Sequence, residues 1–273
     1  MIRLKNLTKK LEMKIVSWNI NALKAHEKAF RYAVDLLQPD VFCLQEIRTR
    51  EDLHAVHVNG YRSYMNPAKQ SQHFGTGIYI KNDIRPMSIT FDPPFPDYEY
   101  QGRVMAMEFG KFVLVNSYWP FSMRTKDNDG LRYRLEWCNM FQEFVHKLQT
   151  RKPVAICGDM NIVRFPFDAY DGKSIKKQPC FYPEEHDSFE KLIEVERLVD
   201  VHHYKHPCPH ENPSGEYTAW AYSKDDVQRN ENQGFRLDYF LVSESIIKYV
   251  KESNVHSDIL GSDHCPISME LEI

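Results

Sequence analysis

Short runs of β-branched and aromatic residues recur along the chain, each bounded by polar residues or proline. They lie at 15–18, 41–44, 78–80, 113–118, 154–157 and 237–242. Runs of this length and composition are typical of buried strands. The C-terminal residues alternate, with Ile267, Met269, Leu271 and Ile273 on one side. This alternation predicts a half-exposed strand.

Apolar residues at three-to-four spacing predict two helices between these strands. Leu23, Phe30, Val34 and Leu37 mark the first helix, and Leu131, Leu135, Cys138, Phe141, Val145 and Leu148 mark the second. Strands and helices interleave without a flexible linker, which predicts a single α/β domain over residues 14–273. Residues 1–13 lack the continuous apolar core of a secretory signal, so we interpret them as a flexible extension.

The chain has 273 residues, with 35 Lys and Arg against 38 Asp and Glu. No stretch approaches the roughly 18 apolar residues of a membrane span, so no membrane contact is expected. The slight acidity argues against a protein that coats polyanions, but it allows a nucleic-acid substrate, because metal-binding carboxylates add local negative charge. The six cysteines include no Cys-x-x-Cys pair, which favours reduced thiols and a cytoplasmic location.

Polar side chains follow several of the predicted strands at the point where each strand ends. Asn19 follows the first strand, Glu46 the second, and Asp159 with Asn161 the strand at 154–157. Strand ends are where α/β proteins present their sites, and carboxylate and amide oxygens suit Mg²⁺. Each of these residues taken alone more often caps a turn. Their repeated placement favours a metal site.

A histidine in the segment GSDHCPI is the main candidate for proton transfer. Asp263 and His264 are adjacent, so in an extended chain they point to opposite sides and cannot orient one another. Asp238 at the head of an apolar strand is the candidate partner of His264, because a buried carboxylate is costly unless it is paired. Tyr118, which ends another strand, is either a core aromatic or a phenol that faces the site.

A run of histidines suggests zinc at first sight. It consists of His202, His203, His206 and His210 with Cys208. The spacing matches no common zinc finger, and Pro207 and Pro209 interrupt it. We therefore interpret this run as a solvated loop.

Six motifs in order resemble those of a known family. They are SWNIN, QPDVFCLQEIR, GRVMAMEF, GDMNI, GFRLDYFLVS and GSDHCPI. Over about residues 14 to 273 the chain resembles the exodeoxyribonuclease III type of apurinic/apyrimidinic endonuclease, within the endonuclease/exonuclease/phosphatase superfamily. The resemblance implies a four-layer αββα sandwich of the DNase I type. It also implies Mg²⁺-dependent hydrolysis of phosphodiesters, with Mn²⁺ as a substitute, in damaged DNA.

The resemblance also implies a role for each site residue. The catalytic set is Tyr118, Asp159, Asn161, Asp238 and His264, and the metal site draws on Glu46, Asn19, Asp159, Asn161, Asp263 and His264. Glu46 would be the principal metal ligand, and Asp159 would activate or position the attacking water. His264, oriented by Asp238, would bind a phosphate oxygen, and Tyr118 would reach the scissile phosphate. These roles cover what diester hydrolysis requires.

Contacts to DNA are expected from the loops. The candidate cations are Arg103, Arg124, Arg132, Lys173, Lys176 and Lys177, although a solvated charge is the more common role for each of them. Trp220, Phe235 and Leu237 match the region where the family receives the extrahelical abasic sugar. Ala219 and Phe121 depart from the family pattern, which usually has a bulky aromatic and an Asn or Gln at these positions. Both departures affect substrate selection rather than the metal.

Together with the resemblance, these observations predict a monomeric DNA repair phosphodiesterase that cuts double-stranded DNA 5′ to abasic sites, with 3′-5′ exonuclease or 3′-end trimming as an additional activity. One alternative is another phosphodiesterase of the superfamily, acting on RNA or as a non-specific nuclease. A second is a nucleic-acid-binding protein on the same fold without catalysis. The complete catalytic set argues against the second alternative, because a pure binder needs no metal ligands combined with an acid/base set.

Overall fold

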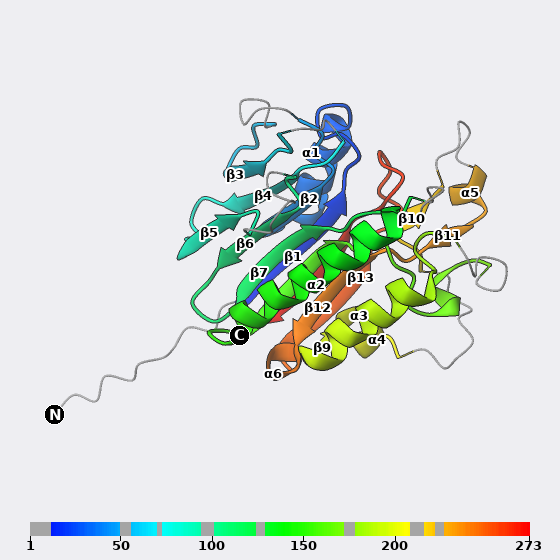
Figure 1. Ribbon diagram of the computed structural model, residues 1–273. Coiled ribbons are helices and arrows are strands. Elements are labelled where there is room, and N and C mark those ends of the chain that lie inside the picture. Colours follow the sequence, from blue (N-terminus) through cyan, green and yellow to red (C-terminus); the bar gives the residue numbers. More distant parts are fainter. Residues whose placement is uncertain are drawn as a thin grey trace.

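Two six-stranded sheets form the centre of the structure (Figure 1). The computed structural model describes residues 12–49, 56–69, 73–93, 101–123, 129–171, 178–207, 216–221 and 227–273. The first sheet has the order β13 (Val250–Val255), β14 (Ile267–Glu272), β1 (Glu12–Asn19), β2 (Val41–Gln45), β4 (Thr76–Lys81) and β3 (Tyr61–Asn66). The second has the order β5 (Ser88–Phe91), β6 (Val104–Glu108), β7 (Val113–Tyr118), β8 (Val154–Asp159), β12 (Asp238–Ser243) and β9 (Leu198–Asp200).

The other elements are helices and one short ribbon. The helices are α1 (Glu27–Leu37), α2 (Asp129–Gln149), α3 (Pro183–Val195), α4 (Val201–Lys205), α5 (Val227–Asn230) and α6 (Glu244–Ile247), with a 3₁₀ turn, η2, at Pro166–Asp168. The ribbon pairs β10 (Ala219–Trp220) with β11 (Gly234–Phe235). None of the helices in the described ranges is long and apolar enough to cross a membrane.

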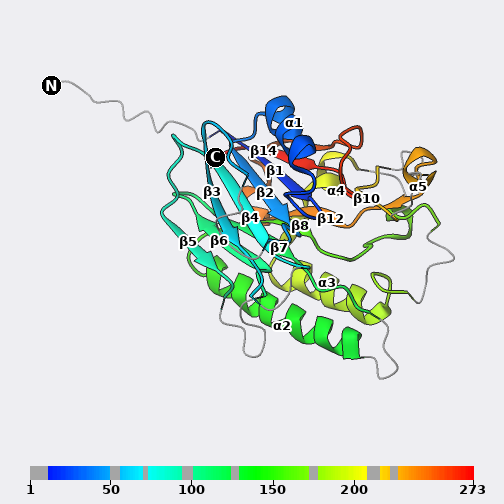
Figure 2. The same cartoon turned by 90° about the horizontal axis from the view of Figure 1, so that it is seen from above.

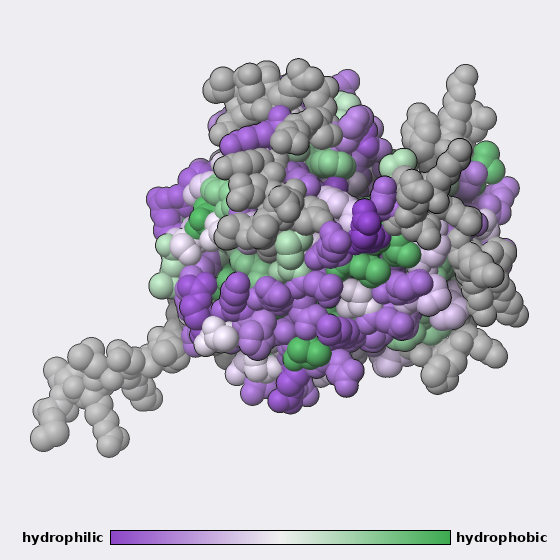
Figure 3. Space-filling model, viewed as in Figure 1, coloured by the Kyte–Doolittle hydropathy of each residue, from purple (hydrophilic) through white to green (hydrophobic). Residues whose placement is uncertain are grey.

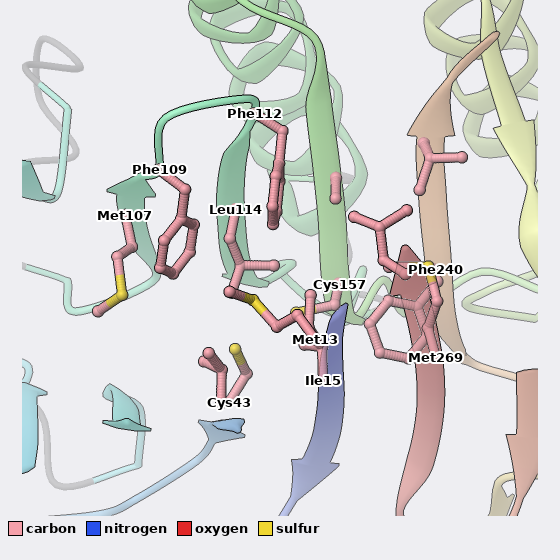
Figure 4. Packing of buried hydrophobic residues seen from close by; sticks show 14 of the residues in the cluster. Met13, Ile15, Cys43, Met107, Phe109, Phe112, Leu114, Cys157, Phe240 and Met269 are labelled. Carbon is pink, nitrogen blue, oxygen red and sulfur yellow. The ribbon is translucent and has the colours of Figure 1, made fainter. Parts of the chain in front are cut away.

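Helices cover the outer face of each sheet, so the molecule has four layers (Figure 2). Side chains such as Met13, Cys43, Leu114 and Phe240 fill the space between the sheets (Figure 4). A second apolar cluster packs α1 on the first sheet, and a third packs α2 and α3 on the second. The four-layer αββα prediction is confirmed.

The buried face of α2 differs in part from the prediction. Cys138, Phe141, Val145 and Leu148 are buried as expected, but Leu131 and Leu135 are only half-buried, and Arg134 and Trp137 are buried near the start of the helix. Arg134 is accommodated because its guanidinium donates to the carbonyls of Pro120 and Met160. The surface over α2 is mostly hydrophilic, with small separate apolar areas (Figure 3).

Two further expectations need correction at the ends of the chain. Residues 12 and 13 belong to β1, and Met13 is buried, although both lie within the predicted extension. The strand β14, between β13 and β1, is half-exposed only toward its carboxyl end, where Glu270 and Glu272 on the alternate face stay partly exposed. Ser268 on that face is buried and hydrogen-bonded to His256. Leu23 precedes α1 rather than lying in it.

Strand directions bring the chemically interesting residues to one edge. The pairs β1–β2 and β7–β8 are parallel, so all four strands present their carboxyl ends there. The strands β12 and β14 run antiparallel to β8 and β1, so they present their amino ends at the same edge. Asp159 consequently lies opposite Asp238 and beside Tyr118 in the register.

Candidate active site

The polar residues at the strand ends lie together at this edge of the two sheets. Asn19 ends β1, Asp159 ends β8, and Asp238 begins β12. All three side chains are buried. Glu46 follows β2 directly, and 13% of its side chain is exposed. The edge therefore has one carboxylate that solvent reaches and two that it does not.

Asn19 connects carboxylates from both sheets. Its Nδ2 donates to Glu46 Oε1 and to Asp159 Oδ2, each at 2.9 Å. Both amide hydrogens are used in these bonds. The backbone N–H of Asn21 donates to Asn19 Oδ1 at 3.2 Å. The orientation of the Asn19 amide is thus fixed, with its oxygen on the side away from the two carboxylates.

Glu46 lies in a strained backbone segment and is held by an arginine. Both Glu46 and Arg48 have a φ of 49°, in the left-handed region that non-glycine residues rarely adopt. Arg48 donates to Glu46 Oε2 through Nη2 at 2.6 Å and Nε at 3.0 Å. Such strain is typical of functional sites, because the surrounding structure must hold it in place.

Asp159 is poised near neutrality. Its Oδ1 accepts the backbone N–H of Asn161 at 2.9 Å, and Asn161, with φ 45°, also donates through Nδ2 to the carbonyl of Trp119. Burial raises the pKa of Asp159 to about 7, and the charge of Asp238 adds to the rise while His264 opposes it. A carboxylate with this pKa can accept a proton at neutral pH.

His264 lies between two carboxylates. Its Nδ1 is 2.8 Å from Asp238 Oδ2, so the expected contact with Asp238 is present, and its Nε2 is 3.9 Å from Asp159 Oδ2. Burial alone would lower the pKa of His264, but the charges of Asp238 and Asp159 outweigh it and raise the pKa well above its ordinary value. The imidazole is therefore protonated at neutral pH and carries an N–H on each ring nitrogen.

Asp263 is hydrogen-bonded to residues other than His264. Its Oδ1 accepts from Asn21 Nδ2 at 2.9 Å and from Ser262 Oγ at 3.2 Å. Ser262 Oγ also lies 2.7 Å from the carbonyl oxygen of Asn19. Asp263 is thereby joined to the end of β1, on the same side of the site as Asn19.

The phenol of Tyr118 faces the site rather than the core. Burial raises the pKa of Tyr118 well above its ordinary value, and the neighbouring charges of Glu46 and Asp159 raise it further. Its ring packs with Phe74, and the Arg103 guanidinium lies 5.0 Å from the ring centroid. The phenol of Tyr118 is therefore neutral at neutral pH and can donate a hydrogen bond.

Few of the predicted DNA-binding cations are described. Arg103 is buried, and it donates to Gln101 and to the carbonyl of Tyr118. The contact of Arg103 with phosphate stays a prediction, whereas its hydrogen bond to the backbone of Tyr118 is present in the structure. Arg132 is exposed and paired with Asp129. Arg124, Lys173, Lys176 and Lys177 lie outside the described residues.

The structure divides the predicted apolar wall into two parts. Phe235 and Leu237 pack together with Val163 and Ala169. Trp220 belongs to a different cluster, with Tyr217 and Cys265, and the Arg229 guanidinium lies over its ring. Ala219 pairs with Phe235 and forms a bridge with His264. Ala219 is only 4% exposed, so neighbouring residues already cover it.

Part of the histidine run forms the helix α4 rather than the solvated loop that the sequence suggested. His203 contacts Asp168 at 3.3 Å, His202 contacts Glu216 at 3.1 Å, and His206 bonds to the carbonyl of Ser253. Cys208 and His210 lie outside the described residues. Each described histidine thus has a separate partner, and none of the described residues forms a group of three His, Cys, Asp or Glu suited to a metal.

A hydrated Mg²⁺ nevertheless fits the strand-end site. Mg²⁺ keeps several waters and is usually bound by only one or two carboxylates, so it does not need three such groups. The side chains of Glu46 and Asp263 offer carboxylate oxygens, whereas Asn19 directs its NH₂ group to Glu46 and its oxygen to the Asn21 N–H. Both carboxylates are hard oxygen donors, and Glu46 is accessible to solvent.

The family model for the endonuclease/exonuclease/phosphatase family matches residues 16–264. This chain belongs to that family. The resemblance inferred from the six motifs is confirmed, and with it the assignment to hydrolases of the nuclease type. Enzymes of the family generally depend on a divalent cation.

Relatives and a solved structure match this chain over nearly the whole length of the chain. A DNA-(apurinic or apyrimidinic site) endonuclease of Dictyostelium discoideum is 36% identical over 270 residues, which are 96% of this chain and 71% of that protein. Recombination repair protein 1 of Drosophila melanogaster is 37% identical, over 97% of this chain but only 38% of its own length. The crystal structure of an AP endonuclease from Leishmania major is similar with a TM-score of 0.83 at 27% identity, covering 96% of this chain and 88% of that one.

Several residues around the site were not selected from the sequence. Asn21 and Ser262 hold Asp263, and Arg48 holds Glu46. Thr218 Oγ1 accepts the backbone N–H groups of Leu237 and Asp238 and so fixes the start of β12. Asn21 carries a usable signal, because it follows Asn19 at the spacing that Asn161 has to Asp159. The others act through contacts between segments far apart in the sequence.

Proposed function

We propose that this nuclease is a Mg²⁺-dependent DNA repair phosphodiesterase that acts as a monomer in the cytoplasm. It cleaves the backbone of double-stranded DNA 5′ to abasic sites and trims damaged 3′ ends. The observation that carries the proposal is the position of His264, with Nδ1 2.8 Å from Asp238 and Nε2 3.9 Å from Asp159, at the edge where Glu46 and Asn19 also lie. This arrangement provides a base and a cationic donor within one small volume.

The chain's own residues supply most of the chemistry. Asp159, with a pKa of about 7, accepts a proton from the attacking water. The Nε2–H of His264 donates to a phosphate oxygen, while Asp238 holds Nδ1 and stabilises the imidazolium. The neutral phenol of Tyr118 donates a further hydrogen bond to the phosphate. Asn161 keeps Asp159 oriented through its backbone N–H.

Glu46 and Asp263 would bind the Mg²⁺ ion, and Mn²⁺ would substitute for it, while Asn19 would hold Glu46 in place through its amide N–H. A bound cation would neutralise negative charge that develops on the phosphate during hydrolysis. Glu46 Oε1 accepts one hydrogen bond, from Asn19, and would keep a lone pair for the cation, whereas Oε2 accepts two bonds from Arg48.

Selection of abasic sites would depend on the apolar surface of Phe235 and Leu237. A nucleotide without its base is easy to flip out of the helix and fits a site that excludes a normal nucleotide. The relatives named for apurinic or apyrimidinic sites support this specificity. The small Ala219 and the exposed Phe121 leave an RNA or non-specific phosphodiesterase as the competing assignment.

A panel of four substrates tests the proposal. The protein is incubated with Mg²⁺ and a duplex containing one tetrahydrofuran abasic analogue, an intact duplex, a duplex with a 3′-phosphate, and a single-stranded RNA. The proposal predicts the highest initial rate on the abasic duplex, measurable removal of the 3′-phosphate, and loss of all activity in EDTA. A higher rate on RNA or equal rates on both duplexes would favour the competing assignment.

A further inference from the structure

The catalytic residues come from two different sheets. Glu46 and Asn19 belong to the first sheet, whereas Tyr118, Asp159 and Asp238 belong to the second. Apolar side chains fill most of the space between the sheets (Figure 4). Apolar contact is non-directional, so it does not by itself fix the position of one sheet relative to the other to within the tolerance of catalysis.

Directional bonds between the sheets are present directly beneath the site. Asn116 on β7 is fully buried, and its Nδ2 donates to the carbonyls of Leu44 at 3.1 Å and Gly77 at 3.0 Å. Those carbonyls belong to β2 and β4 of the opposite sheet. Asn116 Oδ1 accepts from Gln45 Nε2 at 2.7 Å. One side chain of the second sheet therefore makes three hydrogen bonds to the first.

Each member of this network is close in sequence to a site residue. Gln45 immediately precedes Glu46, and its Nε2 also donates to Ser17 Oγ at 3.0 Å. Ser17 is two residues before Asn19, and Asn116 is two residues before Tyr118. In a strand, residues two apart lie on the same face. The network is thus the row of side chains directly below the site.

Stability alone does not account for Gln45. Its Oε1 is buried and accepts no hydrogen bond from the described residues. A buried acceptor without a partner destabilises the folded state. The orientation of the Gln45 amide is nevertheless fixed. Asn116 directs its Nδ2 to two carbonyls, and its Oδ1 therefore faces Gln45 and accepts a hydrogen bond from Gln45 Nε2. A polar residue retained despite this cost is typical of a functional constraint.

We propose that Asn116 and Gln45 are positioning residues that set the register of the two sheets at the active site. They hold Glu46 of the first sheet at a fixed distance from Tyr118 and Asp159 of the second. The inference rests on the proposed phosphodiesterase function, and it assigns the geometry of that site to a network that touches neither substrate nor cation.

Asn116→Leu tests the proposal, because leucine has a similar volume and makes none of the three hydrogen bonds. Met107→Ala is the matched control. Met107 is fully buried between the same sheets, but it lies toward the end of β6 that is farther from the site. For each variant we would measure kcat and KM on the abasic duplex, the Kd for Mn²⁺ without DNA by electron paramagnetic resonance, and the melting temperature.

For Asn116→Leu, kcat should fall about 100-fold, which is the effect of a misplacement near 1 Å, while KM changes by less than about threefold. The Kd for Mn²⁺ should rise several-fold, because Glu46 shifts. Met107→Ala should lower the melting temperature but leave kcat and the Mn²⁺ affinity near the wild-type values. If Asn116→Leu resembles Met107→Ala in kcat and Mn²⁺ affinity at similar stability, the proposal is wrong.

Two outcomes need separate treatment. If Asn116→Leu does not fold, Gln45→Met decides, because it removes the link to Asn116 and Ser17 but leaves both bonds from Asn116 to the strands; unchanged kcat and Mn²⁺ affinity in this variant would overturn the proposal. If the wild-type protein hydrolyses none of the phosphodiesters, the proposed function fails. The Mn²⁺ affinities of the variants then still show whether the network positions Glu46.

Discussion

Replacing Arg236 should destabilise the protein strongly, because its guanidinium lies between two buried carboxylates. Its Nε and Nη2 each donate to Asp168 at 2.9 Å, and Nη1 and Nη2 donate to Asp200 at 3.2 and 2.8 Å. Burial alone would raise the pKa of Asp168 and Asp200, but the charge of Arg236 outweighs it and holds both pKa values below their usual range.

Arg236→Met leaves both carboxylates buried without their main counter-ion. The nearest remaining basic side chains are His203, 3.3 Å from Asp168, and Arg164, 3.6 Å from Asp200. Removing one partner of a buried ion pair typically costs about 3–5 kcal/mol. At roughly 2–4 °C per kcal/mol for a chain near this size, the melting temperature should fall by about 6–20 °C.

The loss should depend on pH in a defined direction. In the wild type the two pKa values are lower in the folded than in the unfolded state, so these carboxylates stabilise the fold above about pH 4. This stabilisation is lost as the pH falls through the folded-state values. In Arg236→Met burial raises both pKa values, so its folded state takes up protons at higher pH than the wild type does. The difference in unfolding free energy between wild type and Arg236→Met should therefore be largest at pH 7 and should narrow steadily as the pH falls.

Urea unfolding followed by circular dichroism at pH 7, 5 and 3.5 measures this difference. Arg132→Met is the control, because Arg132 and its partner Asp129 are exposed, and such pairs contribute at most about 1 kcal/mol. A loss below about 1 kcal/mol for Arg236→Met at pH 7, or a loss that does not change with pH, would refute the reasoning.

Three further predictions concern the site. Glu46→Gln should lose most activity and bind Mn²⁺ more weakly while its melting temperature stays near that of the wild type, because the amide keeps an oxygen for Asn19; unchanged Mn²⁺ affinity would remove Glu46 from the metal site. Asp238→Asn and His264→Asn should each lower kcat by roughly 10²-fold or more, and the double variant should lose little beyond either one, because the pair acts as a unit; additive losses in kcat would contradict this. Phe235→Ala should lower the ratio of kcat/KM on abasic to intact duplex about tenfold, whereas an unchanged ratio would place specificity elsewhere.

Buried strands and their ends were predictable from the sequence, because their apolar runs are nearly continuous. The strands β1, β2, β4, β7 and β8 have such runs. The strands β5 and β13 carry mostly exposed or charged residues, and β10 and β11 have two residues each, so local pattern does not distinguish them from loops. Their pairing depends on partners distant in sequence.

The grouping of the candidate site residues was predictable because polar side chains follow several apolar strands. Each of them alone more often caps a turn, but their repetition singled out Asn19, Glu46 and Asp159, which the structure brings to one edge. Buried arginines were not predictable, because the sequence does not show that Arg236 meets two carboxylates or that Arg103 supports Tyr118. These contacts join segments that only the complete fold brings together.

We propose that this edge of the two sheets hydrolyses the phosphodiester 5′ to an abasic site. Mass spectrometry of the products of a duplex with one tetrahydrofuran residue tests it directly, with wild type and His264→Asn compared in Mg²⁺. We expect a single cut in the wild type. The upstream fragment should end in a 3′-hydroxyl, and the downstream fragment should begin with the abasic residue, which carries a 5′-phosphate. We expect at least about 100-fold less of both fragments with His264→Asn. Cleavage on the 3′ side, cuts spread along the strand, or equal product from the variant would contradict the proposal.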